Sequence, residues 1–583
     1  MYFTWIDYLV FVGLLTISLL IGIYYGCFGT KQNTIEEYLH GGRKLKYFPV
    51  GMSLVASHLS GITVLGIPAE IYLYGTQYMV CPITITLLMI SLLYVFLPVY
   101  YNLQLSSSFE YLNVRFGNST RSLASFLYII STLLYVPIVI YGPSLALNQV
   151  TGISVHVISP LICILCIFYT TLGGLKAVVI SDTIQLSITI LTMFAVFGIG
   201  TYLCGGFTAI WDKAESRDRI EFFNMSLDPT VRQTFWAIVV GMGTTYIGNL
   251  AINPSSIQRF LSLPSFDAAK KSVLVFGFGT MITKLMGAFI GLILFAKYSD
   301  CDPFSTGAIK RVDQLVPYFM MDAIGNLKGL SGLFVAGVFG TALSTMSTNI
   351  NTLSLTFYED FLKSRLPSTL SKKKVTYIIK AIVVISGTIS LCFIFLIEKL
   401  GGVLQIALSV HGLTVGPLVG MTVLGMMFPC ANSKGALIGG VCSTVLSGIL
   451  VVGAQIYLLQ GRIKPPYLSL SIAGCDLNTT ILTTLENTPE PPPAIFLVSF
   501  YYYALIGASI VVIVGLVASW VTRSENDAEV SRKLLTPCIY WLLPKTAENE
   551  HELDVHDKLT QDVDFEKDET ISRGLLVKDT NLS

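Results

Sequence analysis

The sequence predicts an all-α membrane protein with about thirteen transmembrane helices. Hydrophobic residues make up 53% of its 583 residues and charged residues only 13%, whereas soluble domains average about 25% charged residues. The mean hydropathy is +0.68. Long apolar stretches also recur along the chain, and a spanning helix needs about 20 mostly apolar residues. The formal net charge of +1 gives no reason to expect a nucleic-acid partner.

The apolar stretches give the expected helices in order. They cover residues 5–26, 48–74, 77–101, 121–147, 155–172, 177–204, 233–252, 272–297, 328–358, 376–398, 402–428, 435–458 and 494–521. The region 155–204 can be divided in other ways. The first stretch lacks a basic segment before it and is long enough to span, so we predict a helix there and not a cleavable signal peptide.

The loops predict the orientation, because an odd number of spans places the termini on opposite sides. With the N-terminus outside and the C-terminus cytoplasmic, the basic residues gather in the inside loops, as the positive-inside rule requires. These residues are Lys31, Arg43, Lys44, Lys46, Arg115, Arg259, Lys270, Lys271, Lys363, Arg365 and Lys372 to Lys374.

The outside loops carry the predicted covalent features. Asn224 and Asn478 lie in Asn-x-Ser/Thr sequons and are predicted glycosylation sites. Cys301 and Cys475 also fall outside, where a disulfide could form, and two free cysteines are the alternative. The last segment, 522–583, has fourteen acidic residues against eight Lys and Arg and predicts a disordered cytoplasmic tail.

A dense run of hydroxyl and amide side chains interrupts the span 328–358. Its middle reads TALSTMSTNINTLS, from Thr341 to Ser354. In lipid, such side chains need an internal partner or a wet cavity. Because hard cations such as Na⁺ prefer oxygen ligands, the stretch indicates an ion site inside a helix bundle and hence a transport function.

Two spans are interrupted by glycine and small polar residues. The expected span 48–74 contains Gly61 and Gly66 beside Ser57 and His58. The expected span 233–252 includes most of the stretch FWAIVVGMGTTYIGNLAINP, which is residues 235–254. Each opens a set of about five spans, which is the pattern of an inverted-repeat secondary transporter. Helix packing is the alternative reason for these small residues.

Four segments resemble the sodium:solute symporter family, solute carrier family 5. They are GGRKLKYFPVGMSLVASHLSGITVLGIPAEIYLYGTQY (41–78), TLGGLKAVVISDTIQ (171–185), YSDCDPFSTGAIKRVDQLVPYFMMD (298–322) and GLFVAGVFGTALSTMSTNINTLSLTFYEDF (332–361). The likeness covers about residues 5–521 and is strongest to the monocarboxylate, multivitamin and iodide branch. It implies a LeuT-type fold with a five-plus-five inverted repeat, one helix before it and two after.

The resemblance also implies a division of the chain. An extra helix would occupy 1–26, the transporter core with its two inverted repeats and the following helix would occupy 48–458, and an extracellular loop would cover 459–493. The final span would be 494–521, before the tail.

The resemblance implies a principal sodium site made of five oxygens. The carbonyls of Ala56 and Leu59 and that of Thr341 would join the hydroxyls of Ser344 and Thr345. The spacing agrees, because Thr341 lies one helical turn before the adjacent Ser344 and Thr345. The alternative for these hydroxyls is back-bonding to carbonyls four residues earlier.

Two further residues are candidates for a second cation or for coupling. Thr348 extends the same helix face by one turn, and Asp182 follows a GGLKA turn near the start of a long apolar span. Carboxylates at membrane depth mark ion pathways, and the family links this Asp to cation binding. A helix-start cap is the alternative for Asp182.

The candidate substrate-binding residues come from several spans: His58, Thr63, Tyr246, Lys284 and Ser409. Lys284 could counter a carboxylate, with snorkelling or an internal ion pair as the alternative. His58 could be pH-sensitive or a packed neutral histidine. His58 and Ser409 stand where sugar-carrying relatives have Asn and Gln, which weakens a sugar interpretation.

The sequence therefore predicts sodium-coupled import of a small organic anion, a monocarboxylate or vitamin-like molecule, across the plasma membrane. Na⁺ is the coupling ion, and the expected partners are this substrate, Na⁺ and the bilayer. A carrier of sugar, inositol, choline or iodide is the alternative on the same fold, and a non-transporting sensor or channel-like protein is the alternative from another class. No spaced His/Asp/Glu cluster or phosphate loop suggests an enzyme.

Overall fold

The computed structural model describes residues 3–24, 45–103, 105, 107–325, 327–367, 370–397, 402–475, 492–523 and 530–543. These residues form an α-helical bundle. The helices are α1 (Trp5–Ile23), α3 (Tyr47–His58), α4 (Ile67–Tyr74), α5 (Cys81–Ser91), α6 (Leu97–Leu103), α7 (Ser108–Phe116), α8 (Asn118–Thr151), α9 (Val155–Leu203), α10 (Phe207–Glu215), α11 (Gly243–Ile247), α12 (Pro254–Leu261), α13 (Phe266–Tyr298), α14 (Leu315–Asp322), α15 (Leu330–Phe357), α16 (Lys372–Ile397), α17 (Val403–Met427), α18 (Ser433–Leu459) and α19 (Tyr503–Val521).

The helices match the expected spans closely. Within the described residues, nine are long and apolar enough to cross a membrane, or ten if the bent pair α3 and α4 counts as one span. Shorter apolar helices at Trp5–Ile17, Val155–Phe168 and Ala237–Ile252 supply the remaining counterparts. One boundary is different: no turn separates the expected spans 155–172 and 177–204, because α9 runs through both.

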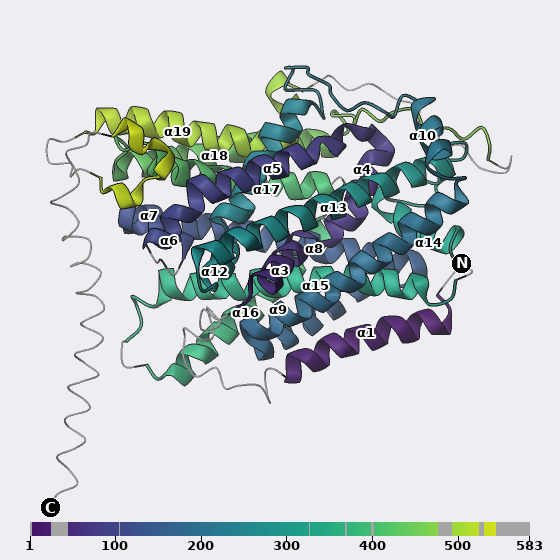
Figure 1. The fold of residues 1–583 in the computed structure, drawn as a ribbon, viewed down its shortest axis with the longest axis horizontal. Coiled ribbons are helices and arrows are strands. Elements are labelled where there is room, and N and C mark those ends of the chain that lie inside the picture. The colour runs from purple at the N-terminus through teal and green to yellow at the C-terminus, as the bar shows by residue number, and fades with distance from the viewer. Residues whose placement is uncertain are drawn as a thin grey trace, which may run out of the picture.

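The bundle has two distinct ends (Figure 1). α10 and α14 lie at one end together with the N-terminus, and α6 and α7 lie at the other. We call the first the disulfide end, because Cys301 and Cys475 form a disulfide bond there, and the second the tail end. α1 lies along one side and α18 and α19 along the opposite side, with α3, α8, α13 and α15 between them.

Both interrupted spans are broken helices. α3 ends at His58, and the chain restarts through the π-helical turn η3 (Ile62–Gly66) into α4, with a bend of 59° between the two halves. The second break follows the π-helical turns η6 (Ala237–Met242) and η7 (Gly248–Ile252). There Asn253 is extended and caps α12 by accepting from the N–H of Ser255. The two breaks leave backbone groups without helical partners near the middle of the bundle.

Close packing holds the second broken helix against α17. A Cβ on Gly248 would lie 2.0 Å from Val415 Cγ1, so only glycine fits at this crossing. The polar helix α15 is central to the bundle, and Thr341, Ser344 and Thr345 are all at most 2% exposed. The hydroxyl run therefore faces protein and not lipid.

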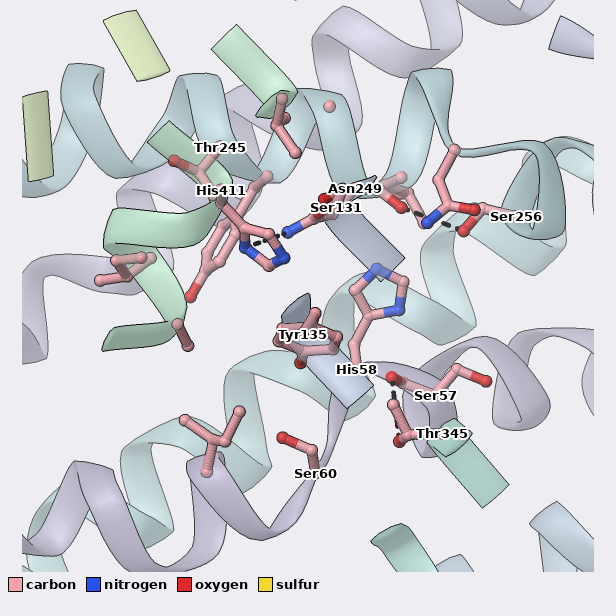
Figure 2. A pocket seen from close by; sticks show the side chains of 18 of the residues that line it. Ser57, His58, Ser60, Ser131, Tyr135, Thr245, Asn249, Ser256, Thr345 and His411 are labelled. Atoms are coloured by element: carbon pink, nitrogen blue, oxygen red, sulfur yellow. Dashed lines mark hydrogen bonds between the residues drawn. The ribbon is translucent and has the colours of Figure 1, made fainter. Parts of the chain in front are cut away.

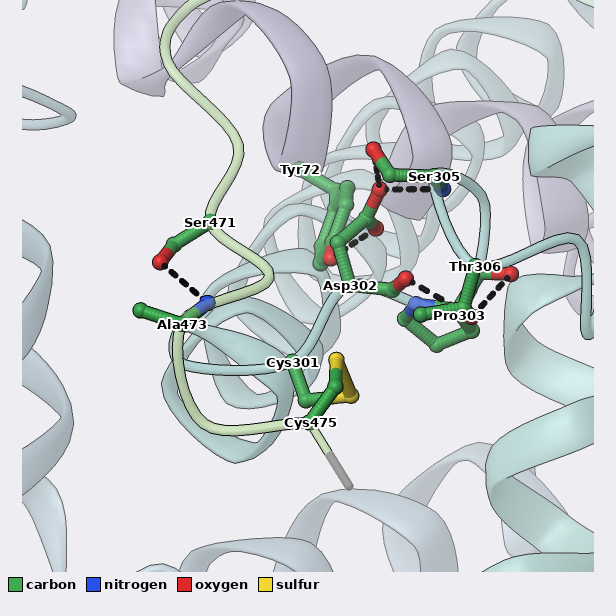
Figure 3. The surroundings of a disulfide bond; sticks show 9 residues. All are labelled: Tyr72, Cys301, Asp302, Pro303, Ser305, Thr306, Ser471, Ala473 and Cys475. Atoms are coloured by element: carbon green, nitrogen blue, oxygen red, sulfur yellow. Dashed lines mark hydrogen bonds between the residues drawn. A yellow bond between two sulfur atoms is a disulfide. The ribbon is translucent and has the colours of Figure 1, made fainter. Parts of the chain in front are cut away.

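The loops at the disulfide end are cross-linked (Figure 3). Beside the bonded Cys301, the carboxylate of Asp302 accepts a 2.6 Å hydrogen bond from the hydroxyl of Tyr72 on α4. Asn224 lies in a half-buried loop at this end, where its backbone bonds Gln77 and Phe235. The other predicted glycosylation site, Asn478, lies outside the described residues.

The predicted disorder of the tail is wrong for residues 530–543. They form two short 3-10 helices, η12 (Arg532–Leu534) and η13 (Pro537–Leu542). Thr536 N–H donates to Met426 O at the end of α17, and the Tyr111 hydroxyl of α7 donates to Leu534 O. Leu534 and Leu535 are buried, so apolar burial and hydrogen bonds order a segment that its charged surroundings suggested was disordered.

Candidate functional site

A cavity of about 140 Å³ lies where the two broken helices meet α8, α13, α15 and α17. Its polar lining side chains come from all of these elements: Ser57, His58, Ser60, Thr63, Tyr78, Ser131, Thr132, Tyr135, Thr245, Tyr246, Asn249, Asn253, Ser255, Ser256, Thr280, Lys284, Thr345, Thr348, Asn349 and His411. Tyr128 and apolar side chains of leucine, isoleucine, valine, phenylalanine, alanine and methionine complete the wall. A mostly apolar cavity with a few convergent polar groups is the usual form of a small-molecule site.

Two histidines point into this cavity (Figure 2). His58 Nδ1 lies 2.9 Å from the Leu54 carbonyl, which only accepts, so Nδ1 carries a proton. His411 Nδ1 lies 3.3 Å from the Asn249 amide nitrogen, which donates, so His411 offers Nε2–H as a donor. The cavity is therefore lined by two histidine rings, one from α3 and one from α17.

Lys284 supplies a positive charge to the cavity from α13. It is 6% exposed, and its Nζ lies 3.2 Å from the Tyr78 hydroxyl and 5.0 Å from the centre of the Tyr246 ring. Among the residues that the structure describes, no carboxylate lies within ion-pair distance of it. This excludes the internal ion pair within that part of the chain and leaves a buried cation beside a cavity, where an anion would stabilise it.

The other expected substrate residues divide into two groups. His58, Thr63 and Tyr246 line the cavity together with Lys284. Ser409 does not line it, because its hydroxyl accepts from Gln455 of α18 at 3.3 Å. The role of Ser409 stays a prediction that the cavity does not support, and His411, two positions later on α17, lines the cavity. A step of two residues turns about 200° around an α-helix, so Ser409 and His411 lie on nearly opposite faces of α17.

The expected sodium residues lie on two facing segments. Ala56 and Leu59 flank the point where α3 ends, so their carbonyls lie at an interrupted helix. Thr345 Oγ1 on α15 lies 3.5 Å from the Ser57 carbonyl and donates a back-bond of 2.9 Å to the Thr341 carbonyl. The structure thus brings the end of α3 and the hydroxyl face of α15 together.

Asp182 lies deep in the bundle at the tail-end side of these residues. It is 1% exposed and accepts hydrogen bonds from the hydroxyls of Ser344 and Ser53, the latter at 2.9 Å. Asp182 does not cap a helix start, because it lies inside α9. Its only ion pair among the described residues is to Arg259 of α12, at 3.6 Å.

Three buried or cavity-lining residues were not among the candidate site residues of the sequence analysis. Arg259 was counted only as a basic loop residue, although it is 1% exposed. Asn249 and His411 bond each other across the cavity. The position of Arg259 beside the break of a polar helix indicated that it needs a buried partner. That partner, Asp182, lies 77 residues away in sequence, so the sequence did not identify it.

Comparisons with known proteins agree with this geometry. The model of the sodium:solute symporter family matches residues 38–443. The chain is 38% identical to sodium-coupled monocarboxylate transporter 2 of Bos taurus over 534 residues, covering 91% of this chain and 86% of that protein. It is 36% identical to sodium-coupled monocarboxylate transporter 1 of Homo sapiens over 547 residues, covering 91% and 89%.

A third relative and a solved structure extend the comparison. The chain is 35% identical to a putative sodium-dependent multivitamin transporter of Drosophila melanogaster over 528 residues, covering 88% and 86%. A Na⁺-coupled sialic acid symporter, solved in a substrate-bound outward-open state, superposes with a TM-score of 0.71 at 23% identity, covering 91% of this chain and 99% of that one. The expected LeuT-type fold is thereby confirmed.

Proposed function

Because this chain belongs to the sodium:solute symporter family, we propose that it imports a small organic anion with Na⁺ across the plasma membrane by alternating access. The chain is a multi-pass membrane protein and a sodium-coupled solute symporter, and its family consists of transporters and not enzymes. The anionic substrate, the sites and the direction are the parts that we propose.

Lys284, which has no carboxylate partner among the described residues, carries the proposal for an anionic substrate. A buried ammonium without a carboxylate partner is costly, and a substrate carboxylate placed in the cavity would pair with it. The names of the relatives, monocarboxylate and multivitamin transporters, support a substrate with one carboxylate. His411 Nε2–H would then donate to a polar group on the rest of the molecule.

We propose the end of α3 and the hydroxyl face of α15 as the sodium site. The carbonyls of Ala56, Leu59 and Thr341 and the hydroxyls of Ser344 and Thr345 are uncharged oxygens, which suits a monovalent ion that must also leave. Ion binding would hold α3 against α15 and so shape the cavity next to it. Each positive charge carried inward gains about 2.3 kcal/mol per 100 mV of membrane potential.

The disulfide end is proposed to face the outside. A disulfide persists in an oxidising compartment, and Cys301 and Cys475 are bonded there. Asn224 of the predicted sequon lies at the same end, and Arg115, Lys270 and Lys271 of the described basic loops lie at the other. These observations support the proposal that the N-terminus lies outside and the tail in the cytoplasm.

Uptake by cells that express the full chain tests the proposal. Lactate, nicotinate and biotin are supplied with Na⁺ or with choline in its place. We expect flux of at least one of them to need Na⁺, and flux that is indifferent to the replacement would contradict the proposal. Lys284→Gln should raise the half-saturating substrate concentration at least tenfold, a loss of about 1.4 kcal/mol, while the exposed Lys270→Gln serves as the matched control.

An iodide carrier is a second candidate, because the same buried Lys284 would also pair with an inorganic anion. Competition separates the two. If iodide, and none of the organic acids, blocks Na⁺-dependent uptake, the substrate is inorganic.

A further inference from the structure

The tail segment 530–543 has one side packed on the bundle and one apolar side left open. Leu534 and Leu535 are buried, and the Tyr540 hydroxyl folds back to donate to the Arg532 carbonyl at 2.9 Å. Trp541 and Leu542, at the end of η13, are instead 80% and 63% exposed. The described part of the chain therefore leaves two large apolar side chains uncovered on an otherwise docked segment.

The surface next to this segment faces lipid. The candidate span Thr76–Leu103 contains α5 and the π-helical turn η5 (Leu92–Phe96). Its large apolar side chains that are 40–63% exposed are Ile83, Leu87, Ile90 and Tyr94. Steps of four, three and four residues place them on one face of the helix. In a bilayer, this face contacts acyl chains.

The tail segment meets that face at its tail-end limit. The Thr536 hydroxyl and the Cys538 thiol both donate to the Tyr94 carbonyl at 3.4 Å. Side chains three residues apart lie above one another in a 3-10 helix, so Trp541 stands on the side of η13 that carries Cys538. The exposed apolar surface therefore extends from η5 onto η13.

A second tryptophan marks the edge of the bilayer at this end. Trp520 and Val521 in the last turn of α19 are 79% and 70% exposed, and the end of α19 and the tail segment both lie at the tail end of the bundle (Figure 1). Tryptophan and tyrosine gather at the membrane–water interface. Trp520 and Tyr94 are therefore at the depth where the membrane ends.

The charge of the segment differs from that of the rest of the tail. Residues 530–543 contain Arg532 and Lys533 and no acidic residue, although 522–583 as a whole has fourteen acidic residues against eight Lys and Arg. The cytoplasmic leaflet of a membrane is anionic and attracts basic segments beside a spanning helix. Charge therefore favours contact of this segment, and not of the acidic remainder, with the leaflet.

We propose that residues 530–543 anchor the tail to the inner leaflet of the bilayer, with Trp541 and Leu542 inserted at the level of the headgroups and Arg532 and Lys533 facing anionic lipid. The partner is a lipid surface. The choice of leaflet rests on the proposed orientation, and the insertion does not. The anchor would also hold the inner ends of α17 and α7 together, because Thr536 N–H donates to Met426 O and Leu534 O accepts from Tyr111.

Quenching of tryptophan fluorescence by brominated lipids tests the insertion. The chain has five tryptophans, so a full-length variant that keeps only Trp541 and has phenylalanine at the other four positions reports on this residue alone. It is placed in nanodiscs that hold a single chain each, which removes a second copy as the cover. We expect the bromines to quench Trp541 as strongly as they quench a companion variant that keeps only Trp520. Quenching of Trp541 by acrylamide in water, and not by the lipids that quench Trp520, would overturn the proposal.

Hydrogen exchange covers the case in which the single-tryptophan variants fail to fold. Trp541→Ser with Leu542→Ser changes only side chains that the protein leaves exposed, so the amides of residues 534–536 would exchange at the unaltered rate if water were the neighbour. With lipid as the neighbour, we expect these amides to exchange about tenfold faster in nanodiscs. Ile495→Ser at the disulfide end, where Ile495 is 61% exposed, is the matched control. An unaltered rate in the double variant would contradict the anchor.

The lipid composition tests the electrostatic part. Adding phosphatidylserine to phosphatidylcholine nanodiscs should strengthen the quenching of Trp541 by brominated lipid. Arg532→Gln with Lys533→Gln should abolish that increase. Quenching that is indifferent to phosphatidylserine would refute the contact with anionic headgroups.

Discussion

Arg232, which is half-buried, and Arg259, which is buried, flank the second broken helix, and they are held in different ways. At the disulfide end, Arg232 forms a two-point pair with Glu70 of α4 at 2.9 and 3.0 Å and donates to Gln405 of α17 at 3.1 Å. Its guanidinium also lies over the rings of Tyr74 and Phe500. At the tail end, Arg259 contacts its carboxylate only at 3.6 Å and otherwise bonds hydroxyl and carbonyl oxygens.

The difference shows two uses of one residue type. A two-point arginine–carboxylate pair is strong and specific in geometry, so Arg232 fastens the outer half of one broken helix to the segment before the other. Arg259 is held more loosely, because the carboxylate of its partner Asp182 also accepts hydrogen bonds from Ser53 and Ser344. We interpret the disulfide-end pair as a closure contact and the tail-end pair as part of the ion-binding apparatus.

The largest expected effect is at the tail end. Asp182→Asn leaves the guanidinium of Arg259 buried without a counter-charge and should lower the free energy of unfolding by about 3–5 kcal/mol. Thermal unfolding in detergent measures this. Adding Arg259→Gln should restore most of the loss. If the double variant is no more stable than the single one, the two residues do not act as a pair.

A smaller loss is expected from the disulfide end. Glu70→Gln should cost about 2 kcal/mol, because Arg232 keeps its bond to Gln405 and its contacts with two aromatic rings. The variant should also favour opening at this end, which faster thiol labelling of an Ala69→Cys reporter would detect. Ala69 lies in the cavity beside this pair. Labelling at the unaltered rate would mean that the pair does not close the bundle.

Substitution of Ser344 tests whether its hydroxyl is a sodium ligand at the tail end. Ser344→Ala should raise the Na⁺ concentration for half-maximal uptake about tenfold, a loss of about 1.4 kcal/mol. Ser347→Ala is the matched control, since Ser347 is equally buried on α15 but donates to the Ser344 carbonyl. An equal shift in both variants would indicate a general effect on α15 and not a lost ligand.

The smallest effect concerns pH at the disulfide end. Burial raises the pKa of Asp313, in the short helix η8 (Val312–Gln314), to about 6, while the Val403 N–H and Arg311 lower it and Glu70 raises it. A raised folded-state pKa contributes stability that is present at low pH and lost as the pH rises through about 6. The unaltered chain should lose about 1 kcal/mol relative to Asp313→Asn between about pH 5 and about pH 7.5. Parallel melting curves for the two proteins would contradict this.

Much of the fold could be predicted from the sequence, because lipid imposes simple length and polarity rules. Every expected span has a helical counterpart, and the two interrupted helices are broken where glycine and polar residues cluster. The continuity of α9 could not be predicted, because Gly173 and Gly174 are compatible with either a turn or a helix. Residues 530–543 were missed because their order depends on distant partners such as Met426 and Tyr111.

The site could be predicted only where it is local in sequence. Thr341, Ser344 and Thr345 share one face of one helix, so their spacing was informative. Ser409 and His411 show the limit, because the face of α17 that meets the cavity depends on how the helix is rotated in the bundle. The pairing of Arg259 with Asp182 joins two helices far apart in the chain, and no spacing rule predicts such a contact.

The docked segment 530–543 also determines where the chain tolerates shortening. Its hydrogen bonds reach the end of α17 at Met426, α7 at Tyr111 and the Tyr94 carbonyl, which Thr536 and Cys538 both approach at 3.4 Å. A stop codon after Leu543 leaves these contacts whole. A stop codon after Thr522 removes them and uncovers the buried Tyr111, so the natural site for attaching a fluorescent reporter is beyond Leu543.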